Sequence, residues 1–257
     1  MMSSEYTAKN INLGLDFDGV LAHGINTKIR YAREWFGVEL KDYQTKKAGF
    51  NELMKKLGKS LDYRDLMDKL NEEHILEYEI PAGCINVLKK LYSEGFRFAI
   101  ITSRNEHDYP YAKIFVKHNF SGIIRYIHNT KDEPKDVFVQ KLRIRAYVDD
   151  DLKKLTELEN TPAQLLYYRQ RENKGINLPL SRGLGILHLP RYHEIKTWQE
   201  FYEAMHRIKE MHESVCWKYG IKNDSFRLKD IDYLCRNLGK RKLKSIIDDY
   251  RKAAAWH

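Results

Sequence analysis

The segment Ile11-Asn12-Leu13-Gly14-Leu15-Asp16-Phe17-Asp18-Gly19-Val20 predicts a buried β-strand that ends in two acidic side chains. Apolar residues alternate over 11–15, which is typical of one buried strand face. Gly19 then lets the chain turn sharply away from the strand end. Asp16 and Asp18 are therefore expected at the carboxyl edge of a sheet, where open α/β folds assemble their sites. Because two acids held this close repel each other, a cation or a retained proton must stabilise them.

Strands and helices are expected to alternate along most of the remaining chain. Further apolar strands are expected at 96–101, 123–127, 146–148 and 164–168, and helices at 81–94, 111–118, 134–142 and 195–219. This alternation predicts an α/β fold with a doubly wound parallel sheet and right-handed crossovers. Residues 169–194 combine Gly and Pro with polar residues, and a long loop is expected there.

Residues 27–80 favour helix almost throughout, with helices expected at 27–36, 50–57 and 62–76. A parallel connection needs only one crossover helix, so this segment is interpreted as an inserted α-helical cap. The expected organisation is an α/β core formed by residues 1–26 and 81–206, the cap at 27–80, and a basic helical extension at 207–257.

Composition indicates a globular chain: of 257 residues, 42% are hydrophobic and 12% aromatic. The first ten residues contain no apolar run typical of a signal peptide, and no run of about 18 apolar residues occurs anywhere. A soluble, cytoplasmic protein without a membrane partner is expected. Cys84, Cys216 and Cys235 show no Cys-x-x-Cys spacing, so we expect free thiols and neither a disulfide framework nor a structural zinc site.

Positive charge is concentrated at the carboxyl end. Residues 207–257 hold 13 lysines or arginines against 7 acidic residues, in a chain of net charge +9. Apolar stripes at 228–238 and 243–250 predict two amphipathic helices, whose docking on the core is favoured over a dimer or nucleic-acid surface. A basic surface raises encounter rates with phosphorylated or nucleic-acid partners without specifying one, and no oligomeric state is predicted.

Each predicted strand end carries a chemically distinct polar group. These groups are Asp16 and Asp18, Thr102 and Ser103, Lys135 before the strand at 146–148, and Asp149 and Asp150 after it. In this order and spacing they resemble the four motifs of the haloacid dehalogenase superfamily of phosphohydrolases, over residues 11 to about 205. The resemblance implies that Asp16 is a nucleophile that forms an aspartyl phosphate, and that Asp18 is the general acid and base. Because the dehalogenase branch lacks an acid at the second position, Asp18 favours phosphoryl transfer.

The same resemblance assigns expected roles to the other groups. Thr102, with Ser103 as the alternate, would bind phosphate oxygens. Lys135 would offset the negative charge of the carboxylates and the phosphate, with Lys131 as a competitor four residues away. Asp151 is expected to cap the next helix.

A metal site is also implied by the resemblance. Its expected ligands are Asp16, the backbone carbonyl of Asp18, Asp149 and Asp150, and Mg²⁺ suits such an all-oxygen site.

The expected function is a Mg²⁺-dependent phosphomonoesterase that acts on a small phosphorylated metabolite, because caps close over small substrates. The stretch from Ile80 to Arg104, the Asp149-Asp150 pair and the helix start at 197–200 are similar to the 5′(3′)-deoxyribonucleotidase branch, which places nucleotides among the candidate substrates. One alternative is a phosphatase of nucleic-acid ends that uses the basic extension to hold the polymer. Another is a non-catalytic binding module on the same scaffold, which the intact acids disfavour.

Overall fold

The computed structural model describes residues 11–131, 133–161, 163–170 and 192–219. Six parallel strands form one sheet in the order β3-β2-β1-β4-β5-β6. The strands are β1 (Ile11–Leu15), β2 (Phe96–Thr102), β3 (Tyr126–Asn129), β4 (Ala146–Asp149), β5 (Gln164–Tyr168) and β6 (Tyr192–Ile195). Strand order reverses between β1 and β4, so the carboxyl ends of these two strands form the crevice where such folds bind ligands.

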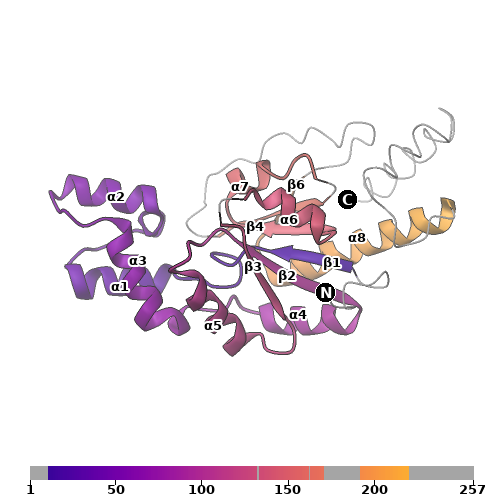
Figure 1. Ribbon diagram of the computed structural model, residues 1–257, viewed down its shortest axis with the longest axis horizontal. Helices are drawn as coiled ribbons and strands as arrows, with labels where there is room; N and C mark the ends of the chain where they lie inside the picture. Colours follow the sequence, from indigo (N-terminus) through magenta and orange to yellow (C-terminus); the bar gives the residue numbers. More distant parts are fainter. Residues whose placement is uncertain (1–10, 132, 162, 171–191, 220–257) are drawn as a thin grey trace.

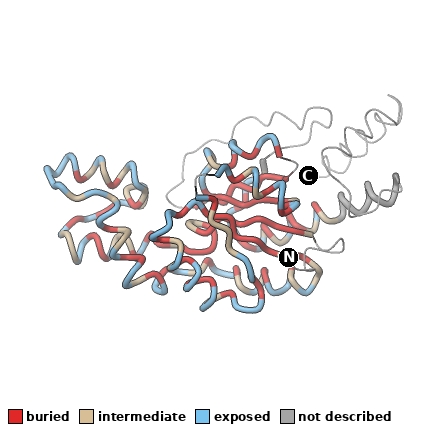
Figure 2. The backbone as a smooth tube through the Cα atoms, in the orientation of Figure 1, coloured by how far each residue is buried: buried red, intermediate tan, exposed pale blue. Residues whose placement is uncertain are grey.

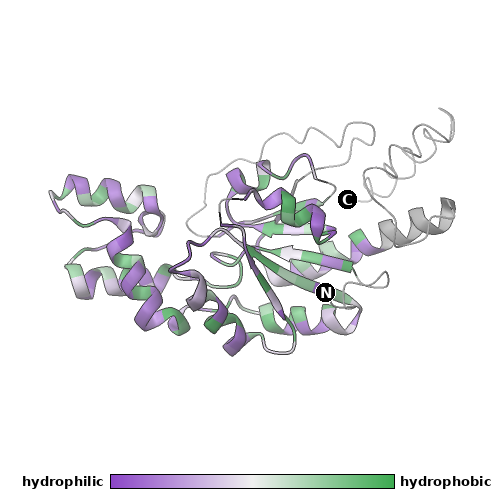
Figure 3. Cartoon of the chain, viewed as in Figure 1, coloured by the Kyte–Doolittle hydropathy of each residue, from purple (hydrophilic) through white to green (hydrophobic). Residues whose placement is uncertain are grey.

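Helices cover both faces of the sheet (Figure 1). The helices α4 (Cys84–Ser93), α5 (Tyr109–Asn119) and α8 (Trp198–Tyr219) contribute to one hydrophobic cluster, and α6 (Lys135–Lys141) and α7 (Leu152–Thr156) to another. Strand β2 contributes to both clusters, because Phe98 and Ile100 belong to the first, whereas Ala99 and Ile101 belong to the second. Since successive strand residues face opposite sides, a sheet covered twice needs apolar residues at nearly every position. The four inner strands β1, β2, β4 and β5 are accordingly buried and largely hydrophobic, whereas the edge strand β3 is partly exposed (Figures 2 and 3). The predicted doubly wound α/β fold is confirmed.

The segment of residues 25–77, which precedes α4 in the connection from β1 to β2, is mainly helical and lies to one side of the sheet (Figure 1). It contains α1 (Ile25–Phe36), η2 (Asp42–Thr45), α2 (Lys47–Lys56), α3 (Tyr63–His74) and η3 (Ile75–Glu77). We call this segment the cap. Its helices pack around their own apolar cluster, which includes Phe50, Met54, Leu66 and Leu70. The two connections to the sheet run side by side, because the backbones of His23 and Glu79 exchange hydrogen bonds of 2.8 and 3.0 Å. The helices expected here are present, and the domain boundaries stay predictions.

Two predictions on the sheet need correction. The strand expected at 123–127 is observed at Tyr126–Asn129, because Ile123 and Ile124 are buried in the turn after α5. The loop expected at 169–194 is wrong at its end, where Tyr192–Ile195 pairs with β5 as a sixth strand. Residues 171–191 and the helices predicted within 220–257 lie outside the described residues.

Cys84 is a buried free thiol, as expected, and burial raises its pKa well above the usual value. The side chains of Cys216 and Cys235 lie outside the described part of the chain. Among the described helices, none has the length and apolar character needed to cross a bilayer.

Candidate active site

The predicted site residues meet at the carboxyl edge of the sheet. Asp16 directly follows β1, Thr102 ends β2 and Asp149 ends β4. The backbone N–H of Asp16 donates to the carbonyl of Val148 at 2.9 Å, which fixes the ends of β1 and β4 together. A cavity of about 290 Å³ opens at this edge, and the side chains of Asp16, Asp18, Thr102, Ser103, Lys135, Asp149 and Asp150 line it.

Lys135 joins the first and fourth strands electrostatically. Its Nζ donates to Asp16 Oδ1 at 2.7 Å and to Asp149 Oδ2 at 2.8 Å, and its side chain is only 3% exposed. Lys131, the competitor named from sequence, is 66% exposed and pairs with Glu106 instead. Of the two lysines, Lys135 is thus the one that contacts the acids of this candidate site, and its role stays a prediction. Its position at the first residue of α6 allows the side chain to reach back beneath the strand ends.

Burial and mutual repulsion dominate the electrostatics of the carboxylates. Burial raises the pKa of Asp16 well above its ordinary value, the charges of Asp149 and Asp18 raise it further, and Lys135 opposes them. Burial also raises the pKa of Asp149, again against Lys135. For Lys135 itself, burial alone would lower the pKa, but Asp149 and Asp16 raise it well above the usual value, so the ammonium stays charged. One ammonium thus serves two buried acids, and the cluster can accept more positive charge.

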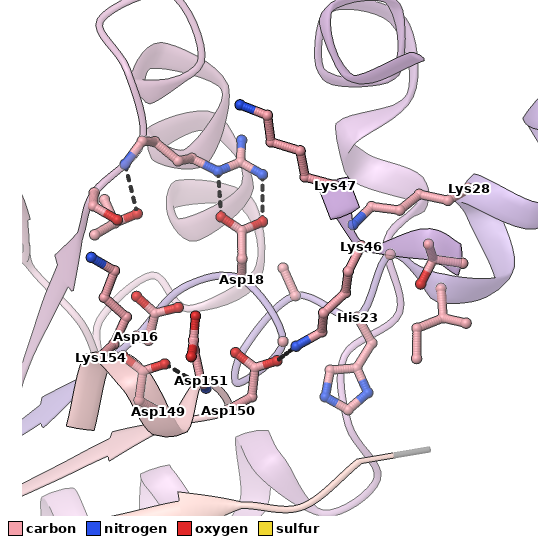
Figure 4. Close-up of a pocket in the computed structure, with 18 of the residues that line it drawn as sticks. Asp16, Asp18, His23, Lys28, Lys46, Lys47, Asp149, Asp150, Asp151 and Lys154 are labelled. Carbon is pink, nitrogen blue, oxygen red and sulfur yellow. Dashed lines mark hydrogen bonds and ion pairs between the residues drawn. The ribbon is translucent and has the colours of Figure 1, made fainter. Parts of the chain in front are cut away.

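The acids fit a divalent cation. Asp16, Asp149 and Asp150 are all buried, and each offers a carboxylate oxygen within 4.8 Å of the others (Figure 4). Three hard oxygen donors with room for water are the ligand set that Mg²⁺ prefers. These three residues would hold the ion. The expected contribution of the Asp18 backbone carbonyl stays a prediction.

Gly19 makes room for this acid cluster. Its φ is +77°, and a Cβ at this position would lie 2.5 Å from Asp150 Cγ. We therefore expect Gly19→Ala to lower the free energy of unfolding by about 1–2 kcal/mol through backbone strain and also to weaken Mg²⁺ binding by displacing Asp150. Chemical denaturation and a Mg²⁺ titration measure the two effects.

Gly37→Ala is the matched control, because Gly37 has φ +61° but an added Cβ there would meet no atom within 4 Å. It shares the strain and lacks the clash. Equal Mg²⁺ affinity in the two variants would contradict a role of Gly19 in placing Asp150.

Asp18 is held by a residue to which the sequence analysis gave no role. Arg104 Nε donates to Asp18 Oδ2 at 2.8 Å, and Arg104 Nη2 donates to Asp18 Oδ1 at 2.7 Å (Figure 4). Burial alone would raise the pKa of Asp18, but the guanidinium holds it below the ordinary value. Two parallel bonds fix both the position and the orientation of this carboxylate.

Arg104 is in turn anchored to the cap. Its Nη1 donates to Asn71 Oδ1 of α3 at 3.0 Å, and its guanidinium lies 4.7 Å from the centroid of the Phe17 ring. Asn71 is fully buried and donates to Asp108 Oδ1 at 3.1 Å. The position of Asp18 therefore depends on how α3 packs against the sheet edge.

Lys46 makes the second contact from the cap to the acid cluster, with its Nζ 2.8 Å from Asp150 Oδ2. The sequence analysis missed this residue as well. A usable signal existed for Arg104, because it directly follows Thr102 and Ser103 at a strand end. Lys46 gave none, since it lies in a lysine-rich segment far along the chain from Asp150.

The remaining predicted residues also lie at the site. Thr102 is buried, with its Oγ1 3.4 Å from the backbone N of Arg104, whereas Ser103 is exposed. Both line the cavity, and their phosphate-binding roles stay predictions. Asp151 caps α7 as expected, because its Oδ1 accepts from the backbone N–H of Lys153 at 2.9 Å.

Comparison with known proteins identifies the fold. No protein-family model matches the chain, and no curated protein matches its sequence. Among solved structures, one similar protein is the haloacid dehalogenase-like hydrolase YfnB from Bacillus subtilis, whose structure contains bound magnesium. It is 15% identical in sequence, and the two structures match with a TM-score of 0.54 over 77% of this chain and 99% of the YfnB chain. A hydrolase of the same group from Deinococcus radiodurans R1, with bound phosphate and sodium, is 15% identical. The match has a TM-score of 0.54 and covers 79% of this chain and 98% of that hydrolase. An L-2-haloacid dehalogenase is 11% identical, and the match has a TM-score of 0.55 and covers 78% of this chain and 100% of the dehalogenase. The chain has the fold of haloacid dehalogenase-like hydrolases.

Proposed function

We propose that the chain is a Mg²⁺-dependent phosphomonoesterase with Asp16 as its nucleophile. The observation that carries this proposal is the pair of carboxylates two residues apart: Asp16 contacts Lys135, and Asp18 is gripped by Arg104. Asp16 thus lies beside a lysine and the acids that could bind a metal, whereas Asp18 is oriented separately by an arginine. Nucleophilic catalysis with a partner acid requires this division of roles.

The two steps follow from these positions. An Asp16 oxygen attacks phosphorus while the bond from phosphorus to the leaving oxygen breaks, and Asp18 gives that oxygen its proton. Asp18 then takes a proton from water as the water oxygen attacks the aspartyl phosphate, which releases inorganic phosphate and restores Asp16. A dianionic ester beside Asp18 raises its pKa by repulsion, and so favours the acid form needed for the first step. Bound Mg²⁺ supplies positive charge that offsets the carboxylates and the phosphate oxygens.

The enclosing cap favours a small ester over the end of a polymer. Lys28, Thr45 and Lys46 from the cap line the same cavity as Asp16, and about 290 Å³ is suited to a phosphate group with part of a metabolite. The phosphate bound to the Deinococcus radiodurans hydrolase is consistent with this substrate class. Nucleotides stay among the candidate substrates.

A panel of phosphate esters, assayed for phosphate release with and without Mg²⁺, tests the proposal. An L-2-haloacid assayed for halide release tests the activity of the dehalogenase neighbour. We expect phosphate release that EDTA abolishes and Mg²⁺ restores, and no halide release. Halide release without phosphate release would overturn the proposal, and so would activity on neither class in the presence of Mg²⁺.

Arg104 offers a test of the acid role of Asp18. We expect Arg104→Gln to lower kcat about 10–100-fold for an alkyl phosphate, whose leaving group needs a proton, because Asp18 is no longer oriented. For p-nitrophenyl phosphate, which leaves without much protonation, the loss is expected to be several-fold smaller. Steady-state kinetics on both esters measure the difference.

Arg104→Lys keeps the positive charge and loses the two-pronged contact, so it is expected to fall between Arg104→Gln and the unaltered protein. An equal loss on the alkyl and nitrophenyl esters would show that Arg104 does not act through Asp18.

A further inference from the structure

A second cavity of about 590 Å³ adjoins the candidate active site on the cap side. Asp18, Lys28, Lys47, Tyr63 and Arg104 line both cavities. The volume lies within the range of about 300–1,000 Å³ that is typical of small-molecule sites. Because Asp18 lines both cavities, an ester that spans them would place its scissile oxygen near this carboxylate.

The acids that line this second cavity already have partners. Asp18 is paired with Arg104. Asp62 accepts the backbone N–H groups of Arg64 and Asp65 as the N-cap of α3. Asp108 accepts from the side-chain amides of Asn71 and Asn105. These acids therefore have their hydrogen-bond donors within the protein, and among the described residues none of them forms an ion pair with Lys28 or Lys47.

Two lysines of the cap line this second cavity. Lys28 and Lys47 form no ion pair within 4.0 Å among the residues that the structure describes, whereas Arg64 is paired with Asp68 at 2.8 Å. The Lys28 side chain extends from the cap toward Asp18 (Figure 4), and Lys47 lines the same two cavities. Burial alone would lower the pKa of Lys28, but Tyr63, Tyr78 and Asp18 raise it, so the ammonium stays charged. Two ammonium groups directed at one cavity can bind an anion there.

We propose that the second cavity binds the leaving group of the substrate, and that this group carries a second anion, a carboxylate or a phosphate, held by Lys28 and Lys47. This inference rests on the proposed phosphatase activity. It narrows the substrate class from phosphate monoesters in general to monoesters of anionic alcohols. Lys28 and Lys47 are then the specificity-determining residues.

Matched pairs of esters test the inference. Sorbitol 6-phosphate and 6-phosphogluconate are both open chains and differ by a carboxylate, and fructose 6-phosphate and fructose 1,6-bisphosphate differ by a second phosphate. We expect kcat/KM to be about tenfold or more higher for the anionic member of at least one pair, and the pair that responds identifies the anion. In Lys28→Gln and in Lys47→Gln this ratio is expected to fall several-fold, and in the double variant to approach one.

Lys55→Gln is the matched control, because Lys55 is exposed on the same helix as Lys47 and lines neither cavity. It is expected to change neither the ratio nor the activity, and thermal unfolding verifies that all variants fold. An active enzyme with ratios near one for both pairs would overturn the inference and leave the phosphatase proposal intact. So would equal losses on both members of a pair, because the lysines would then bind the transferred phosphate. Absence of phosphate release from every ester would overturn the phosphatase proposal and the inference with it.

Discussion

Asp16→Asn is expected to lower kcat for phosphate ester hydrolysis by about 10⁴-fold or more while the fold is retained. Asparagine has nearly the same shape as aspartate, but its amide is a poor nucleophile toward phosphorus. The stability of the variant should be close to that of the unaltered protein, because Lys135 keeps its contact with Asp149 at 2.8 Å. Phosphate release and thermal unfolding, measured on the same preparation, check both expectations.

Two further variants make this test specific. Asp151 lines the same cavity and caps α7, and asparagine caps helices equally well. Asp151→Asn should therefore keep its activity and its stability. Acid quenching during turnover should trap a phosphorylated protein in the unaltered enzyme and none in Asp16→Asn. Substantial turnover in Asp16→Asn, or a phosphorylated product in that variant, would exclude Asp16 as the nucleophile.

The sheet was predictable where residue pattern and strand environment agree. The alternation over 11–15, ended by Asp16, gives β1 directly, and Gln164–Tyr168 is a short apolar run as central parallel strands require. The same reasoning misplaced β3, because the buried apolar pair Ile123 and Ile124 lies in a turn, while the strand itself is an edge strand with exposed Tyr126. An apolar pair indicates burial and does not by itself distinguish a strand from a buried turn.

Strand β6 illustrates a different limit. Tyr192–Ile195 has only four residues, includes the polar His193 and Glu194, and follows a segment rich in Gly and Pro. Its formation depends on pairing with β5, from Leu165 opposite Tyr192 to Tyr168 opposite Ile195. Such a strand is specified by its neighbour and not by its own composition.

At the candidate site, residues at strand ends were predictable from the sequence, whereas residues that reach the site from the cap were not. Chain order placed Asp16, Thr102 and Asp149 at one edge, because parallel strands all end on that side, whereas Lys135 was predicted from the family resemblance. The cap contacts could not be found in this way. Lys46 reaches Asp150 across 104 residues, and Asn71 reaches Arg104 across 33. These pairs follow from the packing of the cap on the sheet, which leaves no pattern in either local sequence.

Replacement of Lys135 by methionine tests whether this residue stabilises the two buried acids. A control variant at a neighbouring lysine and the addition of Mg²⁺ separate that effect from general damage to α6. Lys131→Met is the control, because this exposed lysine lies four residues from Lys135 and contacts neither Asp16 nor Asp149. It should leave stability and activity near those of the unaltered protein. Mg²⁺ should restore part of the stability lost in Lys135→Met, since a ligand that binds only the folded state stabilises it.

Lys135→Met itself is expected to lower the free energy of unfolding by about 3–5 kcal/mol at neutral pH in EDTA, and to abolish measurable turnover. Methionine fills a similar volume but leaves two buried carboxylates without their shared cation. The pKa values of Asp16 and Asp149 are already raised by burial, and loss of the ammonium raises them further. An acid whose pKa is higher in the folded state binds more protons there, so the stability deficit should be small near pH 4 and grow as the pH rises. Denaturant unfolding at several pH values measures this trend. A deficit that does not change with pH would show that lost packing, and not the unpaired charge of the two acids, is the cause.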